Sequence, residues 1–164
     1  MSKPGGTVRS YWDSCLFLDL INVTTGRAEV LGALWDELVA TDSTVIAVTS
    51  ILSVAEVAFA THEKNLQALD PKALLKIEGF WSPSSPIEMV ELYFGVAFEA
   101  RQMIRQALSA GHSLKPHDAI HFAAAKKRGC AHFLTYDDKL YKFSGAFGFT
   151  VKEPKSEQLP FATK

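Results

Sequence analysis

The sequence predicts an α/β fold, a three-layer α/β/α sandwich around a central parallel sheet of about four to five strands. Short runs of β-branched and other apolar residues alternate with helical stretches along the chain. Strands that are separated by helices pair in parallel, and the helices cover both faces of the sheet. The 164 residues, 48% of them hydrophobic, are enough for one domain with a proper core. We therefore expect a single domain over residues 1–164, with its core at about 8–153 and a flexible tail at 154–164.

The first half of the chain contains two expected strands and three expected helices. In chain order, we expect a strand at 8–12, an apolar helix at 14–21, an amphipathic helix at 29–40 and a buried strand at 45–48. Thr49 or Ser50 can then cap a third helix. We expect that helix to carry the apolar residues Ile51, Val54, Ala55, Ala58 and Phe59.

The second half begins with a stretch at 66–86 that shows no familiar pattern, and its last part, GFWSPSSP at 79–86, reads as a loop. Gly111 is a natural C-cap for one helix, and Pro116 suits the first turn of the next. The elements expected in this half are a strand at 87–92, a helix at 94–110, a helix at 116–129, and strands at 131–135 and 149–152.

Composition and targeting signals exclude several classes of protein. No apolar run reaches the roughly 18 to 20 residues that span a bilayer, and MSKPGGTVRS lacks the apolar stretch of a signal peptide. We expect a cytoplasmic protein with no membrane partner. Cys15 and Cys130 have no zinc-like spacing and are interpreted as small core residues. The net charge of −1 argues against a large nucleic-acid footprint but leaves room for a local basic rim.

Acidic residues follow the expected strands at points that a parallel sheet brings to one edge. They are Asp13, Glu56, Asp118 and Asp137. Ligands of open α/β sheets bind outside the carboxyl ends of the strands, where the strand order switches. A carboxylate cluster at that place suits Mg²⁺ or Mn²⁺, because hard divalent cations take oxygen ligands. Such a cation polarises a phosphoryl oxygen and lowers the pKa of a bound water.

Each acidic residue also has a purely structural interpretation. Asp13 can cap the helix at 14–21, Asp118 favours a helix N-terminus, and Asp137 suits a turn. Glu56 is harder to explain in this way, because it lies among apolar residues where a charge needs a partner. Four structural roles at one edge would be a coincidence, so the cluster is favoured. We expect Glu56 to depend most on a bound cation for its charge.

Four stretches of the sequence resemble the PIN domain, in particular the toxins of VapBC toxin–antitoxin pairs. These stretches are YWDSCLFLDLI, SILSVAEV, LKPHDAIHFAAAKKRGC and HFLTYDDKL. The resemblance implies that Asp13, Glu56, Asp118 and Asp137 bind Mg²⁺ or Mn²⁺, with Asp138 as an alternative ligand to Asp137. It assigns Ser14 and Thr135 to supporting contacts with the metal-bound groups. It also implies an RNA substrate, a small antitoxin partner and a homodimer, for which the helices near 16–21 and 31–38 are a candidate surface.

Several basic residues have two open interpretations. Arg101 and Arg105 lie one turn apart and either contact phosphates or form a solvated helix face. His117 and His121 flank Asp118, and either contact the substrate or act as a capping or core histidine.

The leading functional hypothesis is a metal-dependent endoribonuclease that acts as the toxin of a toxin–antitoxin pair. One alternative is a PIN-fold module that binds RNA or protein without catalysis, although all four carboxylates of the pattern are present. Another is a metal-dependent phosphatase, which would use the same ligands.

Overall fold

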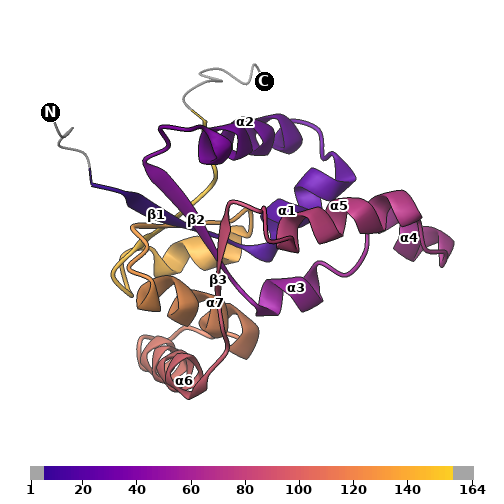
Figure 1. The fold of residues 1–164 in the computed structure, drawn as a ribbon. Coiled ribbons are helices and arrows are strands. Elements are labelled where there is room, and N and C mark those ends of the chain that lie inside the picture. The colour runs from indigo at the N-terminus through magenta and orange to yellow at the C-terminus, as the bar shows by residue number, and fades with distance from the viewer. Residues whose placement is uncertain (1–5, 157–164) are drawn as a thin grey trace, which may run out of the picture.

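A five-stranded parallel sheet lies between two layers of helices, as the sequence predicts (Figure 1). The structure is a computed structural model, and it describes residues 6–156. The strands are β1 (Val8–Trp12), β2 (Val45–Ser50), β3 (Ile87–Val90), β4 (His132–Leu134) and β5 (Thr150–Lys152). The helices are α1 (Ser14–Asn22), α2 (Arg27–Val39), α3 (Leu52–Glu56), α4 (Thr61–Leu66), α5 (Pro71–Trp81), α6 (Phe94–Ser109), α7 (Pro116–Lys127) and the 3-10 helix η1 (Asp138–Phe143).

The strand order is β3-β2-β1-β4-β5. The chain places β2 and β3 on one side of β1 and then β4 and β5 on the other, so the strand order switches between β1 and β4. In the register, Tyr11 stands beside Val48 of β2 and Phe133 of β4. Every neighbouring pair of strands is parallel. The carboxyl ends of β1 and β4 therefore flank the topological switch point, where ligands of this type of sheet bind.

Alternate residues of each strand divide the core between the two faces of the sheet. Tyr11 and Phe133 face α6 and α7, together with a group of phenylalanines between η1 and β5. Trp12 and Leu134, the next residues along β1 and β4, face α1, α2 and α5. In Figure 1 the two helical layers lie on opposite sides of the sheet. Among the described residues, no helix is long and apolar enough to cross a membrane.

The region between β2 and β3 differs from the expectation. The helix that was expected to continue to Phe59 ends at Glu56, because the chain turns to bury Val57 and Ala60 against the α1 side of the sheet. The unfamiliar stretch at 66–86 begins at the last residue of α4 and forms α5, which includes the first part of the expected loop at 79–86. Asp70 caps α5 by accepting a hydrogen bond from the Lys72 amide (2.9 Å).

Parts of the expected tail and of the expected dimer surface are buried in this chain. Pro154 and Ser156 are buried, so the start of the tail packs on the domain. Residues 157–164 lie outside the described part of the chain. Of the apolar helices expected to pair with a second copy, α1 buries Leu16 and α2 buries Leu31 inside this chain's own core. These side chains are therefore not available to a partner.

Candidate active site

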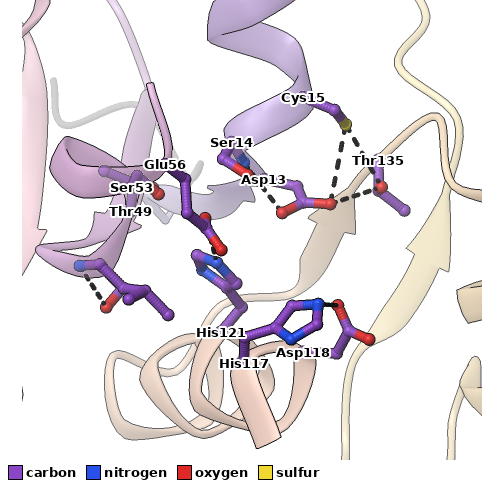
Figure 2. Close-up of polar contacts among 12 residues, drawn as sticks. Asp13, Ser14, Cys15, Thr49, Ser53, Glu56, His117, Asp118, His121 and Thr135 are labelled. Carbon is purple, nitrogen blue, oxygen red and sulfur yellow. Dashed lines mark hydrogen bonds and ion pairs between the residues drawn. The ribbon is translucent and has the colours of Figure 1, made fainter. Parts of the chain in front are cut away.

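The four predicted acidic residues come from four elements that end or begin at the carboxyl edge of the sheet. Asp13 follows β1 and caps α1, and Asp137 follows β4 and caps η1. Glu56 is the last residue of α3, and Asp118 lies in the first turn of α7. Figure 2 shows the carboxylates of Asp13, Glu56 and Asp118 facing the same space between α1, α3 and α7.

Asp13 is fixed by donors on both of its oxygens. The Ser14 amide donates to Oδ1 (2.9 Å), and the Thr135 hydroxyl donates to Oδ2 (2.7 Å). The Asp137 amide in turn donates to the Thr135 hydroxyl oxygen (3.0 Å). Thr135 is fully buried, so this hydroxyl ties the end of β1 to the loop that carries Asp137. Ser14 and Thr135 thus both contact Asp13 directly.

Asp118 is the carboxylate whose ionisation the site opposes. Burial raises its pKa, and the negative charges of Asp13 and Asp137 raise it further, while His117 and His121 oppose the shift. Nε2 of the exposed His117 lies 3.3 Å from Oδ1 of Asp118. The mutual influence of three aspartates that are far apart in sequence shows that the fold brings their charges together.

Glu56 has a partner of its own, and the expectation that it depends most on a cation is wrong. Nε2 of the buried His121 lies 2.8 Å from Oε2 of Glu56. Burial raises the pKa of Glu56, but the His121 contact and the Ser14 and His117 side chains outweigh it and lower the pKa. Burial lowers the pKa of His121, but Glu56, Asp13 and Asp118 raise it by more. The pKa of His121 is therefore above its ordinary value. The charge of Glu56 is therefore supported by this chain's own residues.

The remaining predicted residues divide into two groups. His117 is at the site, as its contact with Asp118 shows. Arg101 lies on the exposed face of α6 with its guanidinium 4.9 Å from the centre of the Phe98 ring. Between residues 6 and 156, no hydrogen bond or ion pair connects Arg101 or Arg105 to the acidic cluster, which favours their interpretation as a solvated face. Asp138 is exposed, whereas Asp137 is partly buried.

The model of the PIN domain matches residues 11–146 of the sequence. The chain belongs to the PIN domain family. The match includes all four acidic residues of the site. Among curated proteins, none matches the sequence.

Solved structures of toxin–antitoxin proteins have the same fold as this PIN domain. VapBC2 from Rickettsia felis, bound to a promoter DNA fragment, has a TM-score of 0.62 at 11% identity, covering 89% of this chain and 98% of that one. FitAcB from Neisseria gonorrhoeae has a TM-score of 0.60 at 19% identity, covering 88% and 97%. VapC20 from Mycobacterium tuberculosis, a sarcin–ricin loop cleaving toxin, has a TM-score of 0.58 at 16% identity, covering 86% and 96%. At these identities the likeness is one of fold.

The donors of the PIN-domain site suit a hard divalent cation. All four are carboxylates, and the like charges that raise the pKa of Asp118 are those that a cation would neutralise. As the side chains stand, no group of three or more Asp, Glu, His or Cys residues within 6–156 is close enough to hold an ion.

Three residues near the site were not anticipated as parts of it. Cys15 was interpreted as a core residue, but its thiol lies 3.7 Å from Oδ2 of Asp13 and 3.5 Å from the Thr135 hydroxyl. Burial, followed by the charge of Asp13, raises the pKa of Cys15 to about 12, so the thiol stays protonated. Tyr11 and Thr49 are fully buried and hydrogen-bonded at the ends of β1 and β2. Each lies in a strand of mostly apolar residues, so the sequence pattern predicts only a core role. The one sequence signal of a further role is a polar side chain near the end of a strand.

Proposed function

We propose that this PIN domain is a metal-dependent endoribonuclease, which hydrolyses RNA phosphodiester bonds with Mg²⁺ or Mn²⁺ held by Asp13, Glu56, Asp118 and Asp137. The observation that carries the proposal is the convergence of acidic charge at the switch point of the sheet, where burial, and after it the charges of Asp13 and Asp137, raise the pKa of Asp118. A helix cap acts within its own helix, so capping alone does not explain why separate elements bring like charges together. The sarcin–ricin loop cleaving toxin of the same fold supports RNA as the substrate.

The residues of the chain have distinct roles in such a reaction. A bound divalent cation supplies stabilisation of phosphoryl charge and a water of lowered pKa. Asp13 is held in place by the Ser14 amide and the Thr135 hydroxyl, so its two oxygens are oriented before any ligand arrives. His117 is exposed at the edge of the site, where it can donate a hydrogen bond to a phosphate of the substrate.

Cleavage assays with matched substrates test the reaction. Labelled RNA, labelled DNA and a generic phosphoester are incubated with the protein, with EDTA and with Mn²⁺. We expect RNA to be cut internally with Mn²⁺ only, and the Asp118→Asn variant to lose this activity by at least about 10²-fold. Lys115→Gln, at an exposed position just before α7, is the control and should cut at the wild-type rate.

The other outcomes identify the alternatives. Binding of RNA without cleavage under any condition would indicate a non-catalytic binding module. Hydrolysis of the phosphoester alone would indicate a phosphatase. If Asp118→Asn cut RNA at the wild-type rate, the assignment of the acidic site would be wrong.

We also propose that the protein acts as the toxin of a toxin–antitoxin pair. The solved structures that share its fold include complexes of toxin with antitoxin and promoter DNA. The antitoxin would be a small protein that covers the acidic site. If a short reading frame next to this gene encodes it, its product should co-purify with this protein and suppress RNA cleavage. Full activity in a saturating excess of that product would contradict the pairing.

A further inference from the structure

A chain of buried hydrogen bonds runs from the end of β2 to Glu56. The Ser50 amide lies 2.8 Å from the Tyr11 hydroxyl oxygen, which lies 2.6 Å from Nδ1 of His121. The other ring nitrogen of His121 lies 2.8 Å from Glu56. Tyr11 and His121 are 0% and 2% exposed, so water does not compete for these contacts. The chain joins β2, β1, α7 and α3 across the middle of the site.

The Ser50 amide leaves the phenolic proton of Tyr11 available for His121. An amide N–H can only donate, so the Tyr11 oxygen accepts from Ser50. The phenolic proton of Tyr11 is then free to donate to Nδ1 of His121. A ring whose Nδ1 accepts carries its proton on Nε2, which donates to the Glu56 carboxylate. In the neutral ring, a hydrogen bond from Tyr11 to Nδ1 leaves Nε2 as the protonated nitrogen that faces Glu56.

Both intermediate residues are held firmly, whereas the end of α3 is not. The Tyr11 ring stacks on Phe133 at 4.9 Å and 8°, and His121 lies among buried alanines of α7. Glu56, in contrast, ends a helix of only five residues. The hydrogen bond from His121 is the larger of two side-chain contacts that orient this carboxylate, and the Ser14 side chain supplies the other.

We propose that Tyr11 and His121 are positioning residues, which hold the Glu56 carboxylate in the orientation required to bind the divalent cation. The inference rests on the proposed function, because Glu56 is a ligand only if the acidic site binds metal. Outer residues of this kind orient the ligands of metal sites, and their loss typically weakens metal affinity by about 10- to 100-fold.

Mn²⁺ binding to the full chain, measured by titration calorimetry, tests the inference without depending on RNA cleavage. Tyr11→Phe keeps the ring on Phe133 and removes only the hydroxyl. We expect its Kd for Mn²⁺ to rise by about 10- to 100-fold. Tyr93→Phe makes the same change at an exposed position before α6 and should keep the wild-type Kd. A wild-type Kd for Tyr11→Phe would overturn the proposal.

A double-mutant cycle separates positioning from a general structural effect. If Tyr11 acts through Glu56, then Tyr11→Phe should change the Kd by less than about twofold in a protein that already carries Glu56→Gln. Effects that multiply in the double variant would show that Tyr11 does not act through Glu56 and would contradict the inference. Thermal melts of all variants in EDTA confirm that each one is folded.

A second pair of variants keeps the test available if Tyr11→Phe does not fold. His121→Gln retains an N–H donor toward Glu56, and His121→Leu removes it. We expect His121→Gln to bind Mn²⁺ at least about tenfold more tightly than His121→Leu. Equal Kd values for these two variants would overturn the role of His121.

Nitrogen NMR of the imidazole rings gives a readout that needs neither metal nor RNA. The chain has five histidines, and the signal missing from His121→Gln identifies His121. We expect the neutral ring to carry its proton on Nε2, and a proton on Nδ1 would refute the hydrogen-bond direction. A wild-type protein that binds Mn²⁺ but leaves RNA intact would disprove the ribonuclease activity alone. A wild-type protein that does not bind Mn²⁺ would disprove the metal site and the positioning role with it.

Discussion

At the scale of single residues, Asp13 and Asp118 lie at the same site but are stabilised differently. Asp13 accepts hydrogen bonds from the Ser14 amide and the Thr135 hydroxyl, so its charge is compensated within the fold. Asp118 is opposed first by burial and then by the charges of Asp13 and Asp137, which raise its pKa. The two positions should therefore respond in opposite ways when the carboxylate becomes an amide.

We expect Asp118→Asn to melt at a higher temperature than wild type at pH 7 in EDTA, because it removes a charge that the folded state disfavours. A raised acid pKa means that stability is lost as the pH rises through the ordinary Asp value of about 3.9 toward the folded value. The advantage of Asp118→Asn should therefore disappear below about pH 4. Asp13→Asn should instead lose about 1 to 3 kcal/mol, since it leaves a buried donor unsatisfied. Equal melting of both variants at pH 7 would contradict this distinction.

Glu63 is a second residue whose carboxylate supports the backbone. Its two oxygens accept from the amides of Ala60 and Asp70, each at 2.7 Å, and connect the start of α4 to the start of α5. These backbone hydrogen bonds lower the pKa of Glu63, with the Asp70 amide as the larger cause. A lowered acid pKa contributes stability above the ordinary Glu value, and this stability is lost as the pH falls through the lowered value.

Glu63→Gln should therefore melt below wild type at pH 7, with the difference shrinking as the pH falls below about 4. Thermal melts between pH 3 and 8, at constant ionic strength, measure this difference. Glu78→Gln, at an exposed position on α5, is the matched control and should follow wild type. A difference between wild type and Glu63→Gln that stays constant over the whole range would show that the charge of Glu63 is not the stabilising feature.

At the scale of elements, α7 combines the site and the core in twelve residues. Its first turn carries Asp118, its middle carries His121, and the next residue, Phe122, packs against Phe133 of β4. Phe122 is fully buried, and its ring centre lies 4.7 Å from that of Phe133. The small residues that follow, Ala123, Ala124 and Ala125, let the helix pack closely on its neighbours. Packing of α7 therefore determines where Asp118 and His121 lie.

Phe122→Ala should lower the free energy of unfolding by about 3 to 5 kcal/mol, because it leaves a cavity among aromatic side chains. Chemical denaturation with urea gives this value. Leu108→Ala, at an exposed position near the end of α6, should change it by less than about 0.5 kcal/mol. If the two substitutions cost the same, the aromatic cluster around α7 would not be the main core of this layer.

At the scale of the whole molecule, exposed apolar residues indicate where a second copy can bind. One exposed aromatic group lies on the first turns of α6, where Phe94 is 82% exposed and its ring contacts that of Phe98. Arg101 lies over the other end of this group. An aromatic surface with a flanking arginine has the composition of protein interfaces. It is a second candidate for the dimer surface, beside α1 and α2.

We expect the wild-type protein to be a dimer at low micromolar concentration, and Phe94→Asp to be a monomer. Light scattering coupled to size exclusion measures both masses. Leu75→Asp introduces the same charge at an exposed position of α5 and should remain a dimer. A monomeric wild-type protein, or a dimeric Phe94→Asp, would place the interface elsewhere or remove it.

The sequence alone determined the layered parallel fold and the identity of the acidic residues. The spacing of apolar residues along the chain is a local property. The strands near 8–12 and 45–48 and the helix from Pro116 were therefore predictable from the sequence. The family resemblance lay in short motifs around the acidic residues, and the PIN-domain match confirms it. Asp70 followed by Pro71 is a typical helix start, so the beginning of α5 was also predictable from the sequence.

Only the tertiary structure decided the partners of each charge. Tyr11 and His121 are 110 positions apart, and His121 and Glu56 are 65 apart, so no local pattern links them. Their contact follows from the strand order, which places β1 between β2 and β4 under α7. The same order brings Asp13 and Asp137 beside Asp118 and so determines which carboxylate is hardest to ionise. Burial and long-range charge are properties of the assembled layers, and a sequence pattern records only which residues are available to form them.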